Sequence, residues 1–507
     1  MSEELKDTAS SKYETDVGVH VTIPMDYAGI DGDYRFTSDE VSAYILDEKV
    51  DASVLRAYDL RILPMAMLMY LFSALDRGNV SNAKSDHLDT DLHFHGNQYN
   101  IMLTVFYVPF CVCAYPGTFL TKKYGAHIML PLYMTGWGVM AMCNAAVKNF
   151  AQCLAVRLLL GIFEGCFGAS LIMYLACFYT RSELGKRMAA WYSMVPHGSG
   201  AFSGLLSYGL FQVHSKLKGW QLLFLIEGGL TLIAASMSYA VLPTYPHKAR
   251  FLSPAQKTAG VMRLLRDSSN QVGSLLTWRE WIEPAKEWET WAWGLYCLFY
   301  GVANQTASTF LTQIVGRFGF STVKTNLLTV GPYSCATFVL WLFVWSSDRQ
   351  RERTFHVMCA NALVVIGSIT LACLPATDHK AGYFCTFLIA SGSFVPSCLF
   401  QSFAQNNTTK ENSKAFRSSV MNFGSNAGGI VTANIFLQRF APHYVTPLIV
   451  SAAIAGTGIV YLGCLRMYMV IDNKRRNKAQ GVNWTSLDVP TSALVDGKKN
   501  PSFRHFL

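Results

Sequence analysis

Apolar runs long enough to cross a bilayer divide the chain into two similar halves. A membrane span needs about 20 mostly apolar residues, and twelve such runs follow one another along the sequence. They cover residues 61–82, 98–120, 127–147, 150–177, 188–213 and 219–242, and then 290–315, 326–345, 354–374, 382–404, 418–438 and 445–468. The pattern predicts an all-α polytopic membrane protein with twelve transmembrane helices in two six-helix, pseudo-symmetric halves.

Polar segments set the limits of these halves. Residues 1–60 form a tail with 14 acids and 5 bases in its first 59 residues and no apolar signal-peptide core, so we expect it to be disordered and cytosolic. The halves cover residues 61–242 and 290–468. Residues 243–289 contain 7 basic residues and are too charged to cross a membrane. Residues 469–507 form the C-terminal tail.

Basic residues are concentrated in alternate loops, and this fixes the expected orientation. Clusters occur at residues 122–123, 181–187, 348–353 and 410–417, whereas the intervening loops hold mostly single bases. The C-terminal tail opens with Lys-Arg-Arg at residues 474–476. Because cytoplasmic loops of membrane proteins carry an excess of Lys and Arg, we expect both termini and the central loop to be cytosolic.

Composition excludes several classes of protein. Hydrophobic residues make up 51% of the 507 residues and charged residues only 15%, whereas soluble domains carry about 25% charge. The net charge of +9 lies in short loops between apolar runs, so it does not indicate a nucleic-acid partner. The 13 cysteines show no metal-site or disulfide spacing. Without a nucleophile–base set or a metal cluster, we expect neither an enzyme nor a cofactor.

Charges inside the apolar runs are confined to the first half. An ionised side chain at mid-membrane costs roughly 2.5–3.5 kcal/mol, so such residues are rare and usually functional. They are Asp76, Arg77, Arg157, Glu164 and Glu227. At a rise of about 1.5 Å per residue, Asp76 lies about 22 Å above the cytosolic face and Arg157 about 10 Å below the outer face. The two share one level of a core about 30 Å thick, so we expect them to form an ion pair.

Two interpretations of this charged group stay open. Glu164 lies seven residues beyond Arg157, two turns along the same helix face. One interpretation is a fixed ion pair that only joins the first and fourth spans. The favoured interpretation is a transport site, because four charges in one small zone exceed what such a pair needs.

Glu227 and His197 are weaker candidates. Glu227 lies about 12 Å from the outer end of its span, and we expect a structural hydrogen bond to a neighbouring helix. His197 stands beside a proline and among glycines near the middle of the fifth span. It either contacts substrate or satisfies a backbone carbonyl.

The second half supplies neutral polar groups at comparable depths. Asn304 and Gln305 lie at the level that Asp76 and Arg77 occupy in the first half, as expected for repeated halves. Asn422 and Asn426 are one turn apart on one face of the eleventh span. All four amides are candidates for substrate binding, although Asn and Gln also serve as hydrogen-bonding glue between membrane helices.

Three sequence motifs resemble one family of transporters. Residues 75–83 (Leu-Asp-Arg-Gly-Asn-Val-Ser-Asn-Ala), 157–165 (Arg-Leu-Leu-Leu-Gly-Ile-Phe-Glu-Gly) and 219–228 (Gly-Trp-Gln-Leu-Leu-Phe-Leu-Ile-Glu-Gly) resemble helix 1, 4 and 6 motifs of the anion:cation symporter branch of the major facilitator superfamily. Residues 319–333 and the ending Asn-Pro-Ser-Phe-Arg at 500–504 are similar to the fungal allantoate permease group.

The resemblance implies proton-coupled import of a small organic anion by alternating access at the plasma membrane. Substrates in the group include allantoate, nicotinate, pantothenate, biotin and sulfur compounds such as cysteine. It also implies that Asp76 and Glu164 carry protons, that Arg77 holds the substrate carboxylate and that Arg157 pairs with Asp76. We expect a monomer that needs only substrate, protons and the bilayer.

The chain departs from the family pattern in two places. The loop motif is degenerate at residues 120–125 (Leu-Thr-Lys-Lys-Tyr-Gly), and residues 401–406 (Gln-Ser-Phe-Ala-Gln-Asn) replace an aromatic pattern in a pocket-lining helix. Substrate identity therefore stays open. Two alternatives also stay open: a facilitator or exporter of the same fold without proton coupling, and a nutrient sensor that binds ligand without transport.

Overall fold

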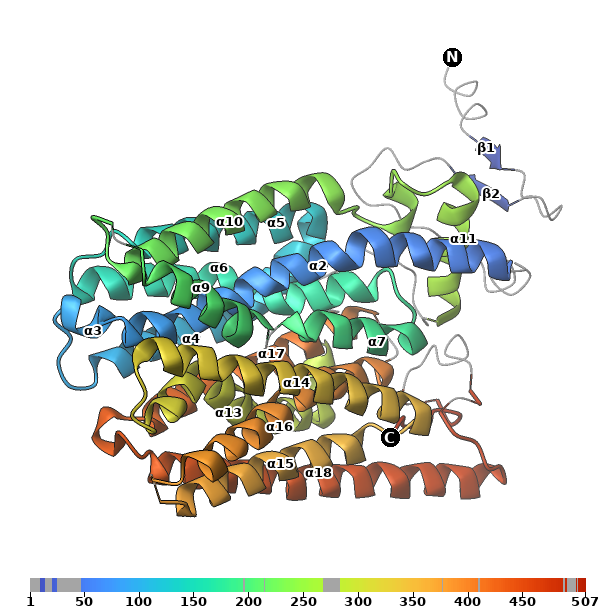
Figure 1. Cartoon of the computed structure of the whole chain (residues 1–507). Helices are drawn as coiled ribbons and strands as arrows, with labels where there is room; N and C mark the ends of the chain where they lie inside the picture. Colours follow the sequence, from blue (N-terminus) through green and yellow to red (C-terminus); the bar gives the residue numbers. More distant parts are fainter. Residues whose placement is uncertain are drawn as a thin grey trace.

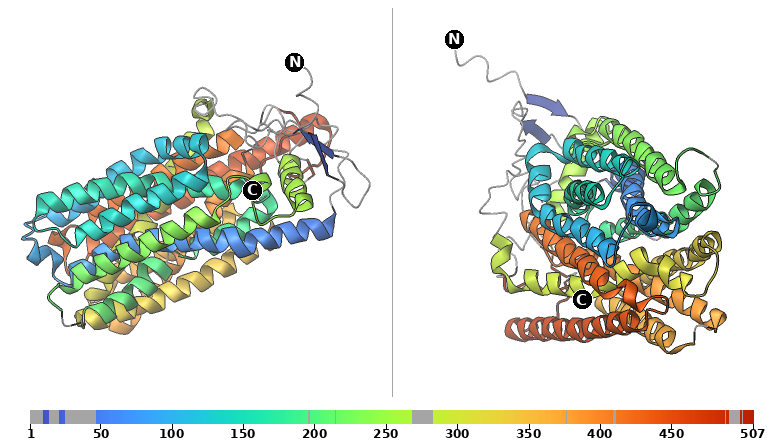
Figure 2. Two further views of the ribbon diagram at one scale, coloured as in Figure 1. Left: turned by 90° about the horizontal axis from the view of Figure 1, so that it is seen from above. Right: turned by 90° about the vertical axis from the view of Figure 1, so that its left-hand side faces the viewer.

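A computed structural model shows two helical bundles packed side by side (Figures 1 and 2). It describes residues 10–13, 21–24, 47–194, 197–213, 215–267, 283–375, 377–408, 411–486, 488–489, 498 and 500–507.

The first bundle contains five long helices and one broken span. The long helices are α2 (Glu48–Ser85), α4 (Gln98–Tyr124), α5 (Ala126–Asn144), α6 (Phe150–Ala176) and α10 (Gly219–Val241). The broken span consists of α7 (Arg181–Tyr192), η1 (His197–Phe202) and α9 (Ser203–Leu210). A short helix, α3 (Leu88–Asp91), follows α2.

The second bundle contains six long helices. They are α13 (Trp288–Gly316), α14 (Thr322–Gln350), α15 (Thr354–Cys373), α16 (His379–Asn406), α17 (Glu411–Ile435) and α18 (Val445–Gln480). A 3₁₀ turn, η4 (Gln438–Phe440), precedes α18. The helices that match the twelve expected spans confirm the predicted fold class. Within the described residues, eight of them are long and apolar enough by themselves to cross a membrane.

The fifth span differs from the single helix expected over residues 188–213. Residues 197–202 form a π-helix between α7 and α9. The sequence places Pro196 directly before this segment, and proline has no amide proton to donate to a helical hydrogen bond. A Cβ atom added at Gly200 would lie 1.7 Å from the Tyr333 ring of α14, so only glycine permits this close approach.

Described parts of the segments expected outside the membrane form regular structure. The helix α2 begins at Glu48 with Asp47 as its N-cap, within the tail expected to be disordered. Two short strands of that tail, β1 (Ser10–Tyr13) and β2 (Val21–Pro24), pair in antiparallel register. Acidic residues suit a helix N-terminus, because they complement its dipole, and this explains why the acidic segment before the first span continues the helix.

The central loop also contains helical structure. After the 3₁₀ turn η2 (Pro246–Lys248) comes α11 (Pro254–Asp267), and η3 (Glu283–Lys286) precedes α13. Arg263 of α11 forms ion pairs with Asp51 of α2, at 3.0 Å, and with Glu183 of α7. The start of α2, α11 and the end of α18 lie at the same end of the molecule, on the right in Figure 1.

Residues 500–507, the C-terminal strap, pack against the second bundle at that same end. The Phe506 amide donates to the Asn407 side chain at 2.9 Å, and the Asn407 amide returns a bond to the Phe506 carbonyl at 3.0 Å. Asn473 of α18 makes the same reciprocal pair with the backbone of His505. These paired bonds fix the course of the chain end.

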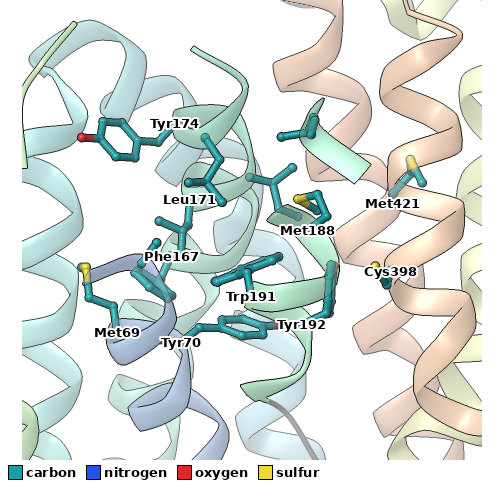
Figure 3. Close-up of a cluster of buried hydrophobic side chains, with 14 of the residues drawn as sticks. Met69, Tyr70, Phe167, Leu171, Tyr174, Met188, Trp191, Tyr192, Cys398 and Met421 are labelled. Atoms are coloured by element: carbon teal, nitrogen blue, oxygen red, sulfur yellow. The ribbon is translucent and has the colours of Figure 1, made fainter. Parts of the chain in front are cut away.

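A hydrophobic cluster crosses the interface between the bundles (Figure 3). Tyr70 of α2 packs against Trp191 and Tyr192 of α7, with ring centroids 4.0 and 5.8 Å apart. Cys398 of α16 and Met421 of α17 belong to the same cluster. Both bundles therefore share one core around the middle of the molecule.

Hydrogen bonds between α4 and α17 join the two halves at both ends of the interface. The Asn100 amide donates to the Ala433 carbonyl at 2.6 Å, and Ser419 bonds to Thr118 at 3.0 Å. Because 18 residues of α4 separate Asn100 from Thr118, these contacts lie about 27 Å apart along the helix. The residues discussed next lie between them.

Candidate functional site

The centre of the first bundle holds an ion pair between α2 and α6. The Arg77 Nε atom lies 3.0 Å from Glu164 Oε1, and the Glu164 side chain is completely buried. Ser73, one turn before Arg77, donates to the same carboxylate oxygen at 2.7 Å and accepts from the Arg77 guanidinium at 2.9 Å. Tyr70 and Phe110 place their rings 6.0 and 5.6 Å from the guanidinium carbon. These contacts together fix the orientation of the Arg77 side chain.

Asp76 does not form the expected ion pair with Arg157. Both carboxylate oxygens of Asp76 are buried without a hydrogen-bond partner among the described residues. Arg157 instead lies over the Phe224 ring of α10, 5.3 Å from its centroid. It is still close enough to act electrostatically on Asp76, as are Arg77 and Glu164. The predicted Asp76–Arg157 ion pair is therefore wrong, and the ion pair that the structure shows within this charged group is Arg77–Glu164.

Glu227 of α10 also differs from its expected role. The residue is 2% exposed, and both of its carboxylate oxygens lack a hydrogen-bond partner among the described residues. The charged group that acts on it is Asp76. Glu227 is therefore not a hydrogen-bonded staple between helices but a second unpartnered carboxyl group beside Asp76.

A small cavity between the two bundles touches Arg77 and Asn304. Its volume is about 20 Å³, roughly the room for one water molecule. The first bundle contributes Arg77 with the aromatic rings of Tyr70 and Tyr192, and the second contributes polar groups of α13 and α16. The Asn304 carbonyl oxygen and the Ser397 hydroxyl are buried without a partner among the described residues. A cation thus faces unoccupied polar groups across the interface.

The other amides of the second bundle bond to one another and to α4. Tyr107 donates to the Gln305 carbonyl oxygen at 2.7 Å. The Gln305 amide faces Asn426 at 3.5 Å, and Asn426 donates to Asn422 at 3.0 Å. The Asn422 amide nitrogen has no partner within the described part of the chain. These residues form a polar chain across α4, α13 and α17, and Asn304 alone of the four lines the small cavity.

His197 lies in the π-helix η1, and its side chain is outside the described residues. Sequence reasoning missed Ser73 and Tyr107, because neutral polar side chains are common in membrane helices and carry no charge cost. The position of Ser73, one turn from Arg77 on the same helix face, was the available signal.

A second opening lies at the end of the interface that is opposite to α11 and the start of α2. Its volume is about 290 Å³, and Lys84 of α2 and Arg317 of α13 contribute cations to its lining. Lys84 faces Gln438 at 3.5 Å and the Tyr99 ring at 4.0 Å. Any anion that approaches the centre from this side therefore passes basic side chains first.

Comparison with known proteins decides the family. The profile of the Major Facilitator Superfamily matches residues 66–433. The chain belongs to this superfamily.

Fungal members of the Major Facilitator Superfamily are similar over nearly the whole chain. An uncharacterized transporter of Schizosaccharomyces pombe is 41% identical, covering 92% of both chains. The major facilitator-type transporter hxnP of Emericella nidulans is 38% identical, covering 92% of this chain and 95% of the relative. The high-affinity nicotinic acid transporter of Saccharomyces cerevisiae is 26% identical, covering 90% and 85%. The protein is therefore a membrane transporter of this superfamily.

A solved structure agrees with this assignment at the level of the fold. It is a bacterial homolog of the human lysosomal transporter Spinster, in an inward-facing and occupied conformation. The similarity has a TM-score of 0.58 at 12% identity and covers 81% of this chain and 96% of that chain. It supports the arrangement of two bundles around a central interface.

Proposed function

We propose that this transporter is a proton-coupled symporter that imports a small organic anion, such as a vitamin-like carboxylate, a ureide or a sulfur compound. The observation that carries the proposal is the buried Arg77–Glu164 ion pair beside a cavity between the two bundles. In the empty protein Glu164 acts as the counter-ion of Arg77. An anionic substrate must compete with this carboxylate for the same guanidinium.

This competition links substrate binding to a proton. When a substrate carboxylate replaces Glu164 beside Arg77, an ionised Glu164 would be left as an unpaired charge in a low-dielectric site, which is costly. Protonation of Glu164 removes that charge. Ser73, which bonds to both Arg77 and Glu164, stays in place for either partner. Substrate and proton are thus taken up together.

Asp76 is the second proposed proton carrier, and Arg157 is its proposed gating partner. Within the described residues, neither oxygen of Asp76 accepts a hydrogen bond, so Asp76 can bind a proton without displacing a donor of the protein. We propose that Arg157 approaches Asp76 when the bundles change their relative position. Alternating access then moves the site from one face to the other.

In this conformation the cavity has room for about one water molecule, so we propose that it widens when the bundles move. Its lining makes a small planar carboxylate the first substrate to test. Tyr70 and Phe394 supply aromatic surface, while Arg77, Asn304 and Ser397 supply polar contacts. A relative of the protein is named a nicotinic acid transporter, so nicotinate is the natural probe. We place the protein in the plasma membrane as a monomer, with both termini in the cytosol.

Uptake into proteoliposomes tests the proposal. Radiolabelled nicotinate and a panel of small carboxylates are offered with an imposed pH difference, acidic outside. We expect accumulation above equilibrium that a protonophore abolishes. Glu164→Gln should lose accumulation but keep exchange of labelled for unlabelled substrate, because exchange needs no net proton movement. Glu48→Gln, at an exposed acid in the same fold, is the matched control.

Other outcomes would distinguish the alternatives. Equilibration without accumulation at any pH difference would indicate a facilitator or exporter. Saturable binding without flux would indicate a sensor. Accumulation that persists in a well-folded Glu164→Gln variant would contradict the assigned role of Glu164.

A further inference from the structure

A wide cavity lies away from the centre, at the end of the first bundle that we place in the cytosol. Its volume is about 980 Å³. The walls come from the part of α2 around residues 60–68, the start of α5, the end of α10 and the segment that follows it. The cavity thus sits where three membrane helices reach the membrane surface.

The cavity is basic. Arg61, Lys248 and Arg250 line it, and the described residues of its lining include no acid. None of the three cations forms an ion pair within the described part of the chain. Arg61 lies over the Phe251 ring, 4.9 Å from its centroid, which holds the guanidinium in place.

Two acidic residues near the cavity form ion pairs with other basic residues. Asp59 bonds to Arg187 of α7 at 2.7 Å, and Asp51 pairs with Arg263 of α11. Because Asp59 and Asp51 are paired elsewhere, neither of them compensates the positive charge of the cavity. A basic cavity between membrane helices at the cytosolic surface is the arrangement that binds lipid headgroups.

The rim of the cavity is apolar and faces outward. Leu60 is 66% exposed, and Met237, Tyr239 and Val241 of α10 are exposed beside it. On a membrane helix such side chains contact acyl chains. A soluble phosphate would use the cations but not this rim, whereas a phospholipid uses both.

We propose that this cavity binds the phosphate headgroup of an anionic phospholipid from the cytosolic leaflet. The headgroup phosphate lies among Arg61, Lys248 and Arg250, and the acyl chains cover Leu60 and the end of α10. The site is separate from the transport site, so it does not depend on the identity of the transported anion. It depends only on the proposed orientation.

The test measures lipid binding to the intact purified protein. Native mass spectrometry compares retention of phosphatidylserine or phosphatidylinositol with that of phosphatidylcholine. We expect the wild type to prefer the anionic lipids, and Arg61→Gln/Lys248→Gln/Arg250→Gln to weaken their binding about tenfold or more. The control Lys474→Gln/Arg475→Gln/Lys478→Gln removes three exposed cations from α18, at the same end of the molecule, and should bind as the wild type does.

Three outcomes would overturn the proposal. They are an equal loss in the control variant, an unchanged preference in the cavity variant, and displacement of the lipid by millimolar inorganic phosphate, which would indicate a soluble ligand. A fourth outcome, a preference that arises only after removal of residues 1–46, would also overturn it and would assign the cavity to the acidic tail. If the triple variant does not fold, Arg250→Gln alone is measured, with an expected loss of several-fold. Nicotinate transport is not part of this measurement. If the protein does not transport nicotinate, the lipid site is therefore still tested independently.

Discussion

Individual charges were the part of the site that the sequence predicted best. Five ionisable residues in apolar runs stand out because each carries a large insertion cost, and the structure gathers Asp76, Arg77, Arg157, Glu164 and Glu227 into one region. Their pairing did not follow from depth alone. Neighbouring residues are turned by about 100° around a helix axis, so Arg77 bonds to Glu164 while Asp76, one position earlier, makes no hydrogen bond within the described residues. Helix rotation is set by packing, which the sequence does not display.

The Arg77–Glu164 pair predicts a specific pattern of stability. Arg77→Gln leaves a buried carboxylate without its cation and should destabilise the protein by about 3–5 kcal/mol. Arg77→Gln/Glu164→Gln leaves no unpaired charge and should recover most of that loss. Thermal unfolding of the purified variants in one detergent at one pH measures both values. Losses that simply add in the double variant would show that the two residues do not interact.

Glu227 predicts the opposite behaviour. Its carboxylate accepts no hydrogen bond within the described structure, so Glu227→Gln removes no stabilising contact and replaces a buried acid by a neutral amide of the same shape. We expect unchanged or higher thermal stability, with a change within about 1 kcal/mol of zero or in the stabilising direction. A loss of more than about 2 kcal/mol would restore the structural role that the sequence suggested.

At the scale of elements, the number and order of the helices followed from the apolar runs, but their ends and breaks did not. Hydropathy marks where a chain can lie in a bilayer, not where a helix begins or ends. The helices α2 and α18 therefore extend beyond their spans into water, where Asp47 caps α2. The π-helix within the fifth span depends on close contact between Gly200 and Tyr333, which joins segments distant in sequence.

The C-terminal strap gives a pH prediction. His505 is buried against Asp472, with Lys498 and Arg476 nearby, and burial together with Lys498 lowers its pKa to about 4. In a free tail its pKa would be about 6.5. The docked strap therefore holds the neutral histidine, and docking is fully stable above about pH 6.5 and weakens progressively as the pH falls toward 4.

Hydrogen exchange of the strap measures this effect. Protection of the Phe506 amide, corrected for the intrinsic exchange rate, should decrease between pH 7 and pH 5 in the wild type. His505→Gln keeps a donor for Asp472 but does not titrate, so its protection should stay constant over that range. A wild-type protection that rises toward acidic pH would show that His505 is charged when docked.

The whole molecule follows the symmetry that the sequence predicted, but its two halves differ in chemistry. The first bundle supplies the charges and the second supplies amides and hydroxyls. Asn304 and Arg77 meet at the central cavity from opposite sides, although Gln305 and Asn426 bond within the polar chain instead. The equal depth expected for these residues in two repeats therefore did not predict which of them reach the cavity.

The whole molecule is also expected to have a definite orientation in the membrane. The start of α2, α11 and the C-terminal strap share one end of the molecule with the basic loops, so one face should be cytosolic throughout. Epitope tags placed before residue 47, in residues 268–282 and after residue 507 should be reached by antibody only in permeabilised cells. Labelling of any of these tags in intact cells would reverse the assignment.

The Arg77–Glu164 pair has a consequence for membrane voltage. As a paired cation and anion, the two residues carry no net charge through the bilayer when the empty protein changes conformation. With a bound monoanion beside Arg77 and a proton on Glu164, the same group is again neutral. A potential of 100 mV acts with about 2.3 kcal/mol on each net elementary charge that crosses the membrane, and here it finds none to act on. The Arg77–Glu164 pair is therefore insensitive to the membrane potential, and any dependence of uptake on voltage must come from the proton that we propose for Asp76.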